Sequence, residues 1–201
     1  MVNGTLNLND SNKLKLSLGA IPKGSQSATL IILSGLPGTG KSYFSKHITK
    51  NLPDSLIIET DLMRKVLFDK PNYSGPENAR LFRACHHLVE DILQNGISVI
   101  FDATNLIRKN RRKLYNIADR LGVKIVVVKI EAPEQIIFQR LIQRTINPNE
   151  TENSSADLSV YEKMKKTVQP IVRSHFIVDT SEDIGKPLKN IIRKIHFEHS
   201  T

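Results

Sequence analysis

The sequence predicts an α/β protein built on an open, parallel five-stranded sheet with helices on both faces. From residue 29 onward, short apolar runs alternate with segments of helical length. A glycine-rich loop follows the first apolar run, and acidic residues follow the next two. This alternation is typical of parallel sheets that bind their ligands beyond the carboxyl ends of the strands.

Each expected strand is a short apolar run. A continuous run of this kind, bounded by turn residues, is typical of a strand buried on both faces. The expected strands are residues 30–33, 56–58, 98–101, 124–130 and 176–178.

The helices are expected between these strands. Gly96 and Gly122 are stop signals for two of them, and Pro133 precedes a third. The expected helices are residues 41–51, 77–95, 107–121 and 134–144.

The length of 201 residues indicates one domain. Residues 1–28 are polar, and their leucines alternate only weakly. We expect an N-terminal arm there, disordered or at best an edge strand, before a domain that spans residues 29–201. The polar stretch from Asn147 to Ser155 is expected to be a mobile loop of that domain.

Composition narrows the class of protein. No apolar run approaches the roughly 20 residues of a membrane span, and the N-terminus does not resemble a secretory signal, so we expect a cytoplasmic protein. Cys85 is the only cysteine, and its apolar helical context predicts a buried thiol. The net charge of +9 favours polyanionic partners. The basic run at residues 108–113 fits a solvated helix face or a nucleic-acid patch.

The glycine-rich loop is the strongest motif, because it follows a strand pattern and opens a helix pattern. Its glycines let the backbone wrap closely around an anion, and successive N–H groups bind phosphate oxygens. Lys41 is expected to reach the β and γ phosphates of ATP, and Ser42 to ligate Mg²⁺. The expected ATP-binding residues are Gly35, Leu36, Pro37, Gly38, Thr39, Gly40, Lys41 and Ser42.

A second candidate site follows the second expected strand. The carboxylate of Asp61 can accept the proton of an attacking hydroxyl, and Arg64 lies one helical turn further on. In the alternative interpretation, Asp61 caps a helix at residues 62–70 and Arg64 is a surface residue.

Asp102 follows the third expected strand, where P-loop proteins often place a carboxylate that holds Mg²⁺ or its water. Thr104 and Asn105 can cap the next helix, and capping explains this stretch equally well.

Arg140 and Arg144 are four residues apart and therefore share one face of the helix after Pro133. Two guanidinium groups on a movable lid can neutralise a transferring phosphoryl group, and Arg140 is also expected to bind ATP. The spacing alone fits a pair of solvated arginines as well.

Together these motifs resemble the AAA-type predicted kinases of the P-loop superfamily, which include polynucleotide 5′-hydroxyl kinases and zeta-toxin-like kinases. The resemblance runs from about residue 29 to residue 183 and implies a nucleoside-kinase-like fold with an arginine-bearing lid. It rests on the glycine-rich loop, on the pairs Asp61 with Arg64 and Arg140 with Arg144, on residues 102–105, and on residues 155–161 and 178–181.

The resemblance also implies roles for individual residues. Asp61 corresponds to a general base, Arg64 to a residue that binds a phosphate of the acceptor, and Arg144 to a lid arginine that contacts the ATP phosphates. Asp102 corresponds to an aspartate that helps to hold the site together. Residues 180–183 correspond to a loop near the adenine.

The expected activity is transfer of the γ-phosphoryl group of ATP, with Mg²⁺, to a hydroxyl, with Lys41, Asp61 and Arg144 as catalytic residues. A polynucleotide 5′-hydroxyl and a small-molecule acceptor both stay open, because residues 71–83 match no substrate signature. A nucleotide-switch ATPase and a nucleic-acid-binding protein that uses ATP only structurally are the alternatives from other classes.

Overall fold

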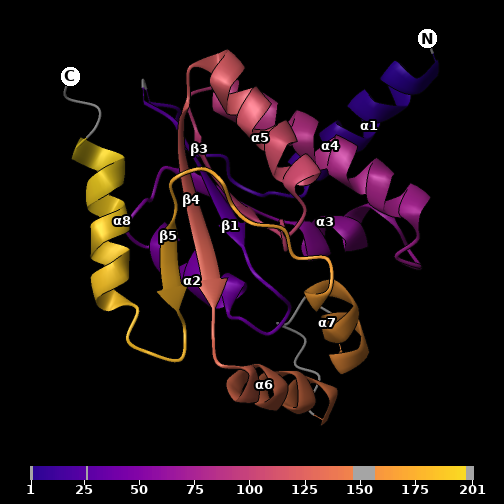
Figure 1. Cartoon of the computed structure of the whole chain (residues 1–201). Helices are drawn as coiled ribbons and strands as arrows, with labels where there is room; N and C mark the ends of the chain where they lie inside the picture. The colour runs from indigo at the N-terminus through magenta and orange to yellow at the C-terminus, as the bar shows by residue number, and fades with distance from the viewer. Residues whose placement is uncertain (1, 26, 147–156, 198–201) are drawn as a thin grey trace.

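The computed structural model describes residues 2–25, 27–146 and 157–197. Within these residues, five parallel strands form one sheet in the order β2-β3-β1-β4-β5 (Figure 1), which confirms the predicted fold class. The strands are β1 (Thr29–Ser34), β2 (Ser55–Glu59), β3 (Ser98–Asp102), β4 (Lys124–Glu131) and β5 (Phe176–Asp179). Each lies within one residue of its predicted bounds.

Helices cover both faces of this sheet (Figure 1). Leu30 and Ile32 of β1 pack on the face covered by α1, α3, α4 and α5, whereas Ile31 and Leu33 pack on the face covered by α2 and α8. This strict alternation explains why the run is apolar throughout. The helices are α1 (Val2–Leu16), α2 (Lys41–Thr49), α3 (Thr60–Leu67), α4 (Gly75–Gln94), α5 (Arg108–Leu121), α6 (Glu134–Ile146), α7 (Leu158–Lys165) and α8 (Gly185–Phe197).

Two interpretations based on helix capping are wrong. Asp61 lies inside the first turn of α3, after the N-cap residue Glu59. Helix α5 has Ile107 as its N-cap residue, so Thr104 and Asn105 precede the cap. Both polar stretches are therefore available for other roles at the ends of β2 and β3.

The N-terminal segment contains a helix instead of an edge strand. Leu14 of α1 is fully buried in the core cluster that includes α4, and Arg80 of α4 donates two hydrogen bonds to the carboxylate of Asp10, at 2.7 and 2.8 Å. Few apolar residues mark this helix, which is why the sequence pattern did not reveal it. The division of the chain at residue 28 stays a prediction, and the loop expected at residues 147–155 lies outside the described residues.

Cys85 of α4 is buried, as predicted, and burial raises the pKa of its thiol to about 12. A thiol with this pKa is almost fully protonated at neutral pH and is therefore a poor nucleophile. No described helix has the length and apolar character that a membrane crossing requires.

Helix α1 offers a direct test of its docking. Truncation of Leu14, which is 0% exposed, to alanine removes core packing, and we expect the free energy of unfolding to fall by about 2–5 kcal/mol. Leu16→Ala on the same helix is the matched control, because Leu16 is 86% exposed. Urea denaturation of both variants measures the difference, and equal stabilities would mean that α1 does not dock.

Candidate functional site

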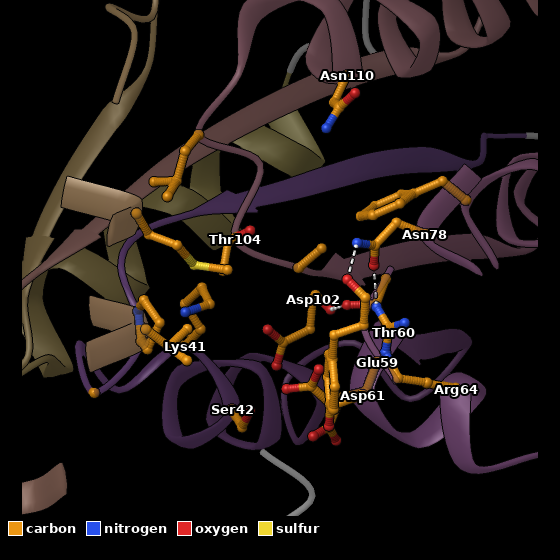
Figure 2. A pocket seen from close by; sticks show the side chains of 18 of the residues that line it. Lys41, Ser42, Glu59, Thr60, Asp61, Arg64, Asn78, Asp102, Thr104 and Asn110 are labelled. Carbon is orange, nitrogen blue, oxygen red and sulfur yellow. Dashed lines mark hydrogen bonds between the residues drawn. The ribbon is translucent and has the colours of Figure 1, made fainter. Parts of the chain in front are cut away.

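The candidate site is a cavity of about 1330 Å³ beyond the carboxyl ends of β1, β2 and β3. Glu59 and Asp102 are register partners at the ends of β2 and β3, and the amide of Gly35 donates a 3.0 Å hydrogen bond to the carbonyl of Thr104. Three loops that lie far apart in the sequence therefore meet at one edge of the sheet. Figure 2 shows Lys41, Ser42, Asp61 and Asp102 around this space.

The glycine-rich loop has the backbone of a phosphate-binding turn. Gly38 and Gly40 adopt φ values of 81° and 87°, in the left-handed region that favours glycine, and α2 begins directly after Gly40. Lys41 Nζ donates a 2.9 Å hydrogen bond to the Leu36 carbonyl. Burial lowers the pKa of Lys41, although Asp102 and Asp61 act against that shift. An incoming phosphate would offer Lys41 a stronger, charged acceptor than this carbonyl.

Asp102 is 3% exposed and accepts a 3.1 Å hydrogen bond from Ser45. Burial raises its pKa, while the Lys41 charge and hydrogen bonds from Ser42 and Ser45 oppose that rise. The Ser42 hydroxyl and the Asp61 and Asp102 carboxylates offer the hard oxygen ligands that Mg²⁺ prefers. Among the described residues, no group of three or more His, Cys, Asp or Glu side chains could hold a metal ion. The donor set therefore fits an ion that is held jointly with nucleotide phosphates and water.

Asp61 lines the cavity from the first turn of α3. It is close enough to Lys41 and Asp102 for its charge to influence the pKa of both groups. Glu59 also lines the cavity, although no role was predicted for it. Its position directly after an apolar strand was the signal that could have identified it.

Arg64 lines the cavity too, but it is buried, so the surface interpretation is wrong. Its guanidinium donates hydrogen bonds to Glu77 and, at 2.6 Å, to Asn78, and it stacks on the Tyr73 ring at 4.5 Å. Burial by itself raises the pKa of Glu77, but hydrogen bonds from the Asn72 amide, Arg64 and the Tyr73 amide outweigh it and lower that pKa. The Arg64 charge is thus already neutralised within the chain, and its role toward an acceptor phosphate stays a prediction.

Arg140 and Arg144 both line the cavity, whereas their spacing predicted only that they share one face of a helix. Arg140 Nη1 donates to the Gly38 carbonyl at 3.3 Å and to Thr180 Oγ1 at 2.8 Å, and Nη2 donates to the Thr180 carbonyl at 2.9 Å. Thr180 Oγ1 in turn donates to the Thr39 carbonyl at 2.7 Å. Arg140 therefore ties α6 to the glycine-rich loop and to the loop after β5. Its expected contact with ATP stays a prediction, as does that of Arg144.

Helices α6 and α7 lie beyond the carboxyl ends of the strands (Figure 1) and share a small apolar cluster. Ile137, Leu141 and Tyr161 are its buried members, and Leu36 of the glycine-rich loop packs against it. Lys165 of α7 also donates a 2.6 Å hydrogen bond to Glu134 of α6. Helices α6 and α7 therefore rest directly on the glycine-rich loop.

A wall made by α4, α5 and the loop before α5 is the part of the site that the sequence did not reveal. Figure 2 shows Asn78 and Asn110 on this side of the cavity. The basic run at residues 108–113 was the available signal for α5, but it was equally consistent with a solvated helix face. The wall residues are Asn78, Ala79, Phe82, Arg83, Leu106, Ile107, Lys109, Asn110 and Lys113.

A substitution in the glycine-rich loop tests the contact with α6. A Cβ at Gly38 would lie 2.9 Å from Ile137 Cγ2 and 3.1 Å from Leu141 Cγ, so Gly38→Ala must displace α6 as well as strain the backbone. We expect ATP affinity to fall ~10-fold or more, given the 1.4 kcal/mol that a tenfold change represents. Isothermal titration calorimetry measures this affinity.

Gly122→Ala is the matched control, because Gly122 also has a positive φ, of 65°, but has nothing within 4 Å of an added Cβ. It should lose stability without losing ATP affinity. Equal losses of ATP affinity in both variants would mean that backbone strain, and not the contact with α6, is responsible.

Comparison with known proteins places this chain in a family. The family profile AAA_33, described as an AAA domain, matches residues 30–171. The L-seryl-tRNA(Sec) kinase of Methanococcus maripaludis is 36% identical over 119 residues, which cover 57% of this chain and 46% of that protein. The chain thus spans less than half the length of this relative.

A second relative matches in sequence, and a solved structure shares the fold. The adenylyl-sulfate kinase of Myxococcus xanthus is 22% identical over 162 residues, 79% of this chain and 88% of that protein. The crystal structure of Chaetomium thermophilum Kti12 in complex with ADP-AlF3 superimposes with a TM-score of 0.66 at 18% identity, covering 83% of this chain and 96% of that one. The chain belongs to the AAA_33 family of AAA domains and has the fold of the P-loop kinases.

Proposed function

We propose that this protein is an ATP-dependent kinase that phosphorylates a hydroxyl carried by a nucleic acid, with the 5′-hydroxyl of a polynucleotide as the leading acceptor. The observation that supports phosphoryl transfer is the Asp61 carboxylate in the same cavity as Lys41 and Ser42. A general base beside a phosphate-binding loop is the arrangement that hydroxyl kinases require.

In this proposal, the glycine-rich loop and the N-terminus of α2 bind the β and γ phosphates, and Lys41 exchanges the Leu36 carbonyl for phosphate oxygens. The acceptor oxygen bonds to the γ phosphorus while the bond from that phosphorus to the β–γ bridging oxygen breaks. The acceptor proton passes to Asp61, and ADP leaves. Arg144 stabilises charge on the transferring group. Bound Mg²⁺ would supply charge neutralisation between the phosphates, with Ser42 and Asp102 on its side of the cavity.

The distribution of charge in the cavity supports a polyanionic acceptor. Arg83, Lys109 and Lys113 project from the wall made by α4 and α5, and the described lining residues of these two helices include no carboxylate. The acidic lining residues Glu59, Asp61 and Asp102 lie instead at the strand ends, near Lys41. A wall of one sign is the pattern that attracts a phosphate backbone. The seryl-tRNA kinase relative acts, by its name, on a nucleic-acid-borne substrate.

Replacement of Asp61 by asparagine tests the general base. Asp61→Asn keeps the shape of the side chain but cannot accept the proton, so we expect kcat for transfer to fall ~10²-fold or more while the Kd of ATP stays within a factor of about two. Transfer of labelled γ-phosphate measures kcat. Asp69→Asn is the control, because Asp69 is exposed just after α3. Full activity of Asp61→Asn would remove Asp61 from the mechanism.

The acceptor is tested with a panel of RNA and DNA 5′-hydroxyl ends, nucleosides and sugars. Lys109→Gln combined with Lys113→Gln should raise the KM of a polynucleotide acceptor ~10-fold and reduce the slope of affinity against salt by ~1–2, because two phosphate contacts are lost. Lys186→Gln with Lys189→Gln, on the exposed side of α8, should change neither value.

Each outcome of the panel has a distinct meaning. Phosphorylation of nucleosides or sugars, with no reaction at polynucleotide ends, would contradict the acceptor and leave the kinase proposal intact. Rapid ATP hydrolysis without transfer to any acceptor would instead favour the nucleotide-switch ATPase.

A further inference from the structure

Arg111 of α5 is a buried cation whose hydrogen bonds go to backbone carbonyls. It is 2% exposed. Its Nη1 donates to the carbonyls of Asn105 and Leu106 at 2.7 and 2.8 Å, and its Nη2 donates to those of Gln169 and Pro170 at 3.0 and 2.5 Å. One guanidinium therefore holds two segments that are more than 60 residues apart in the chain.

Burial of the Arg111 charge must be compensated by well-placed hydrogen-bond acceptors. A buried charge costs free energy unless other groups replace its water, and here four carbonyl dipoles do so. The guanidinium suits the task because it presents five N–H donors in a fixed plane, whereas the three donors of a lysine radiate from one nitrogen atom. Arg111 also lies in the basic run whose other described members are exposed, so it does not belong to a solvated helix face.

The two segments lie against each other, and each is next to residues that line the cavity. The first follows β3 and contributes Thr104, Leu106 and Ile107 to the lining, whereas the second follows α7, which contributes Val160 and Met164.

The junction between the two segments includes further hydrogen bonds. The Gln169 amide donates to the Leu106 carbonyl at 3.0 Å, and the Gln169 side chain accepts from the Arg108 amide at 2.8 Å.

The loop after β3 is in turn anchored to the phosphate-binding turn. The Gly35 amide donates to the Thr104 carbonyl at 3.0 Å, Asn105 Nδ2 donates to the Leu33 carbonyl at 2.7 Å, and Ser34 Oγ donates to the Asn105 carbonyl at 3.2 Å. A continuous set of hydrogen bonds thus links the end of β1, the loop after β3 and the segment after α7.

We propose that Arg111 is a positioning residue that fastens the segment after α7 to the loop after β3 and so sets how these two parts of the protein lie beside the cavity in which the acceptor binds. Arg111 is not one of the cavity-lining residues and acts through the two segments it holds. The expected effect on acceptor kinetics rests on the proposed function. A shift of about 1 Å in such spacing can cost ~10²-fold in rate, because the reacting oxygen must lie about 3–3.5 Å from phosphorus.

The test compares Arg111→Lys with Arg173→Lys. Lysine keeps the charge at position 111 but cannot span four carbonyls on two segments. Arg173 provides the control, because it lies in the same region, pairs with Asp119 at 2.6 Å and is about half exposed. The measurements are KM for the acceptor, Kd for ATP, and hydrogen exchange of the Gln169 amide, which reports the bond to Leu106.

For Arg111→Lys we expect acceptor KM to rise ~10-fold or more, ATP Kd to stay within about twofold, and exchange at Gln169 to accelerate. Arg173→Lys should match the wild type in all three. If Arg111→Lys has the same acceptor KM as the wild type, the proposal is overturned. A parallel loss of ATP affinity, kcat and thermal stability also overturns it, because it indicates a purely structural role.

The outcome is separable from that of the proposed function. If the wild-type protein phosphorylates no acceptor in the panel, the proposed function fails. The exchange of Gln169 then still decides whether Arg111 fastens the two segments, and unchanged protection in Arg111→Lys overturns the inference.

Discussion

The close enclosure of the glycine-rich loop is the constraint on which the rest of the structure depends. A Cβ at Gly35 would lie 2.4 Å from the Ile130 carbonyl of β4, and one at Gly40 would lie 2.8 Å from Thr180 Oγ1. The Gly35 backbone therefore lies against the backbone of β4, and the Gly40 backbone lies against the Thr180 side chain, with no room for a side chain on either glycine. Arg140 and the cluster around Leu36 then hold α6 and α7 directly against this loop.

The same enclosure shapes the electrostatics of the site. Burial lowers the pKa of Lys41 and raises that of Asp102, so each group is held in an environment that disfavours its charge when no ligand is bound. A nucleotide phosphate with its metal ion would compensate both groups at once. The pairing of Arg64 with Glu77 acts differently, because that pair is already complete and holds the start of α4 against α3. The charges of Lys41 and Asp102 would thus be compensated by a ligand, whereas those of Arg64 and Glu77 compensate each other.

Local patterns were sufficient for the strands, the phosphate-binding loop and the position of Asp61, because period, turn chemistry and motif spacing act over a few residues. They were insufficient for α1, whose stability comes from Leu14 packing against α4 and not from its own pattern. They also left the basic run on α5 ambiguous. In the folded chain this run divides into Lys109 and Lys113, which line the cavity, and Arg111, which is buried behind the wall.

The sequence by itself thus determined the fold class, the glycine-rich loop and the strand-end acids. The loop, the acids and each strand depend on neighbours within about one helical turn or one strand, and the fold class follows from the order of these elements along the chain. Only the tertiary structure decided that Arg64 is neutralised by Glu77, that Arg140 binds Thr180, and that Arg111 joins segments near residues 105 and 169. Apart from the local contact of Arg111 with Asn105, these contacts bring together residues 13 to 58 positions apart. A pairing over such separations depends on how strands are ordered and helices packed, and residue spacing along the chain does not encode that directly.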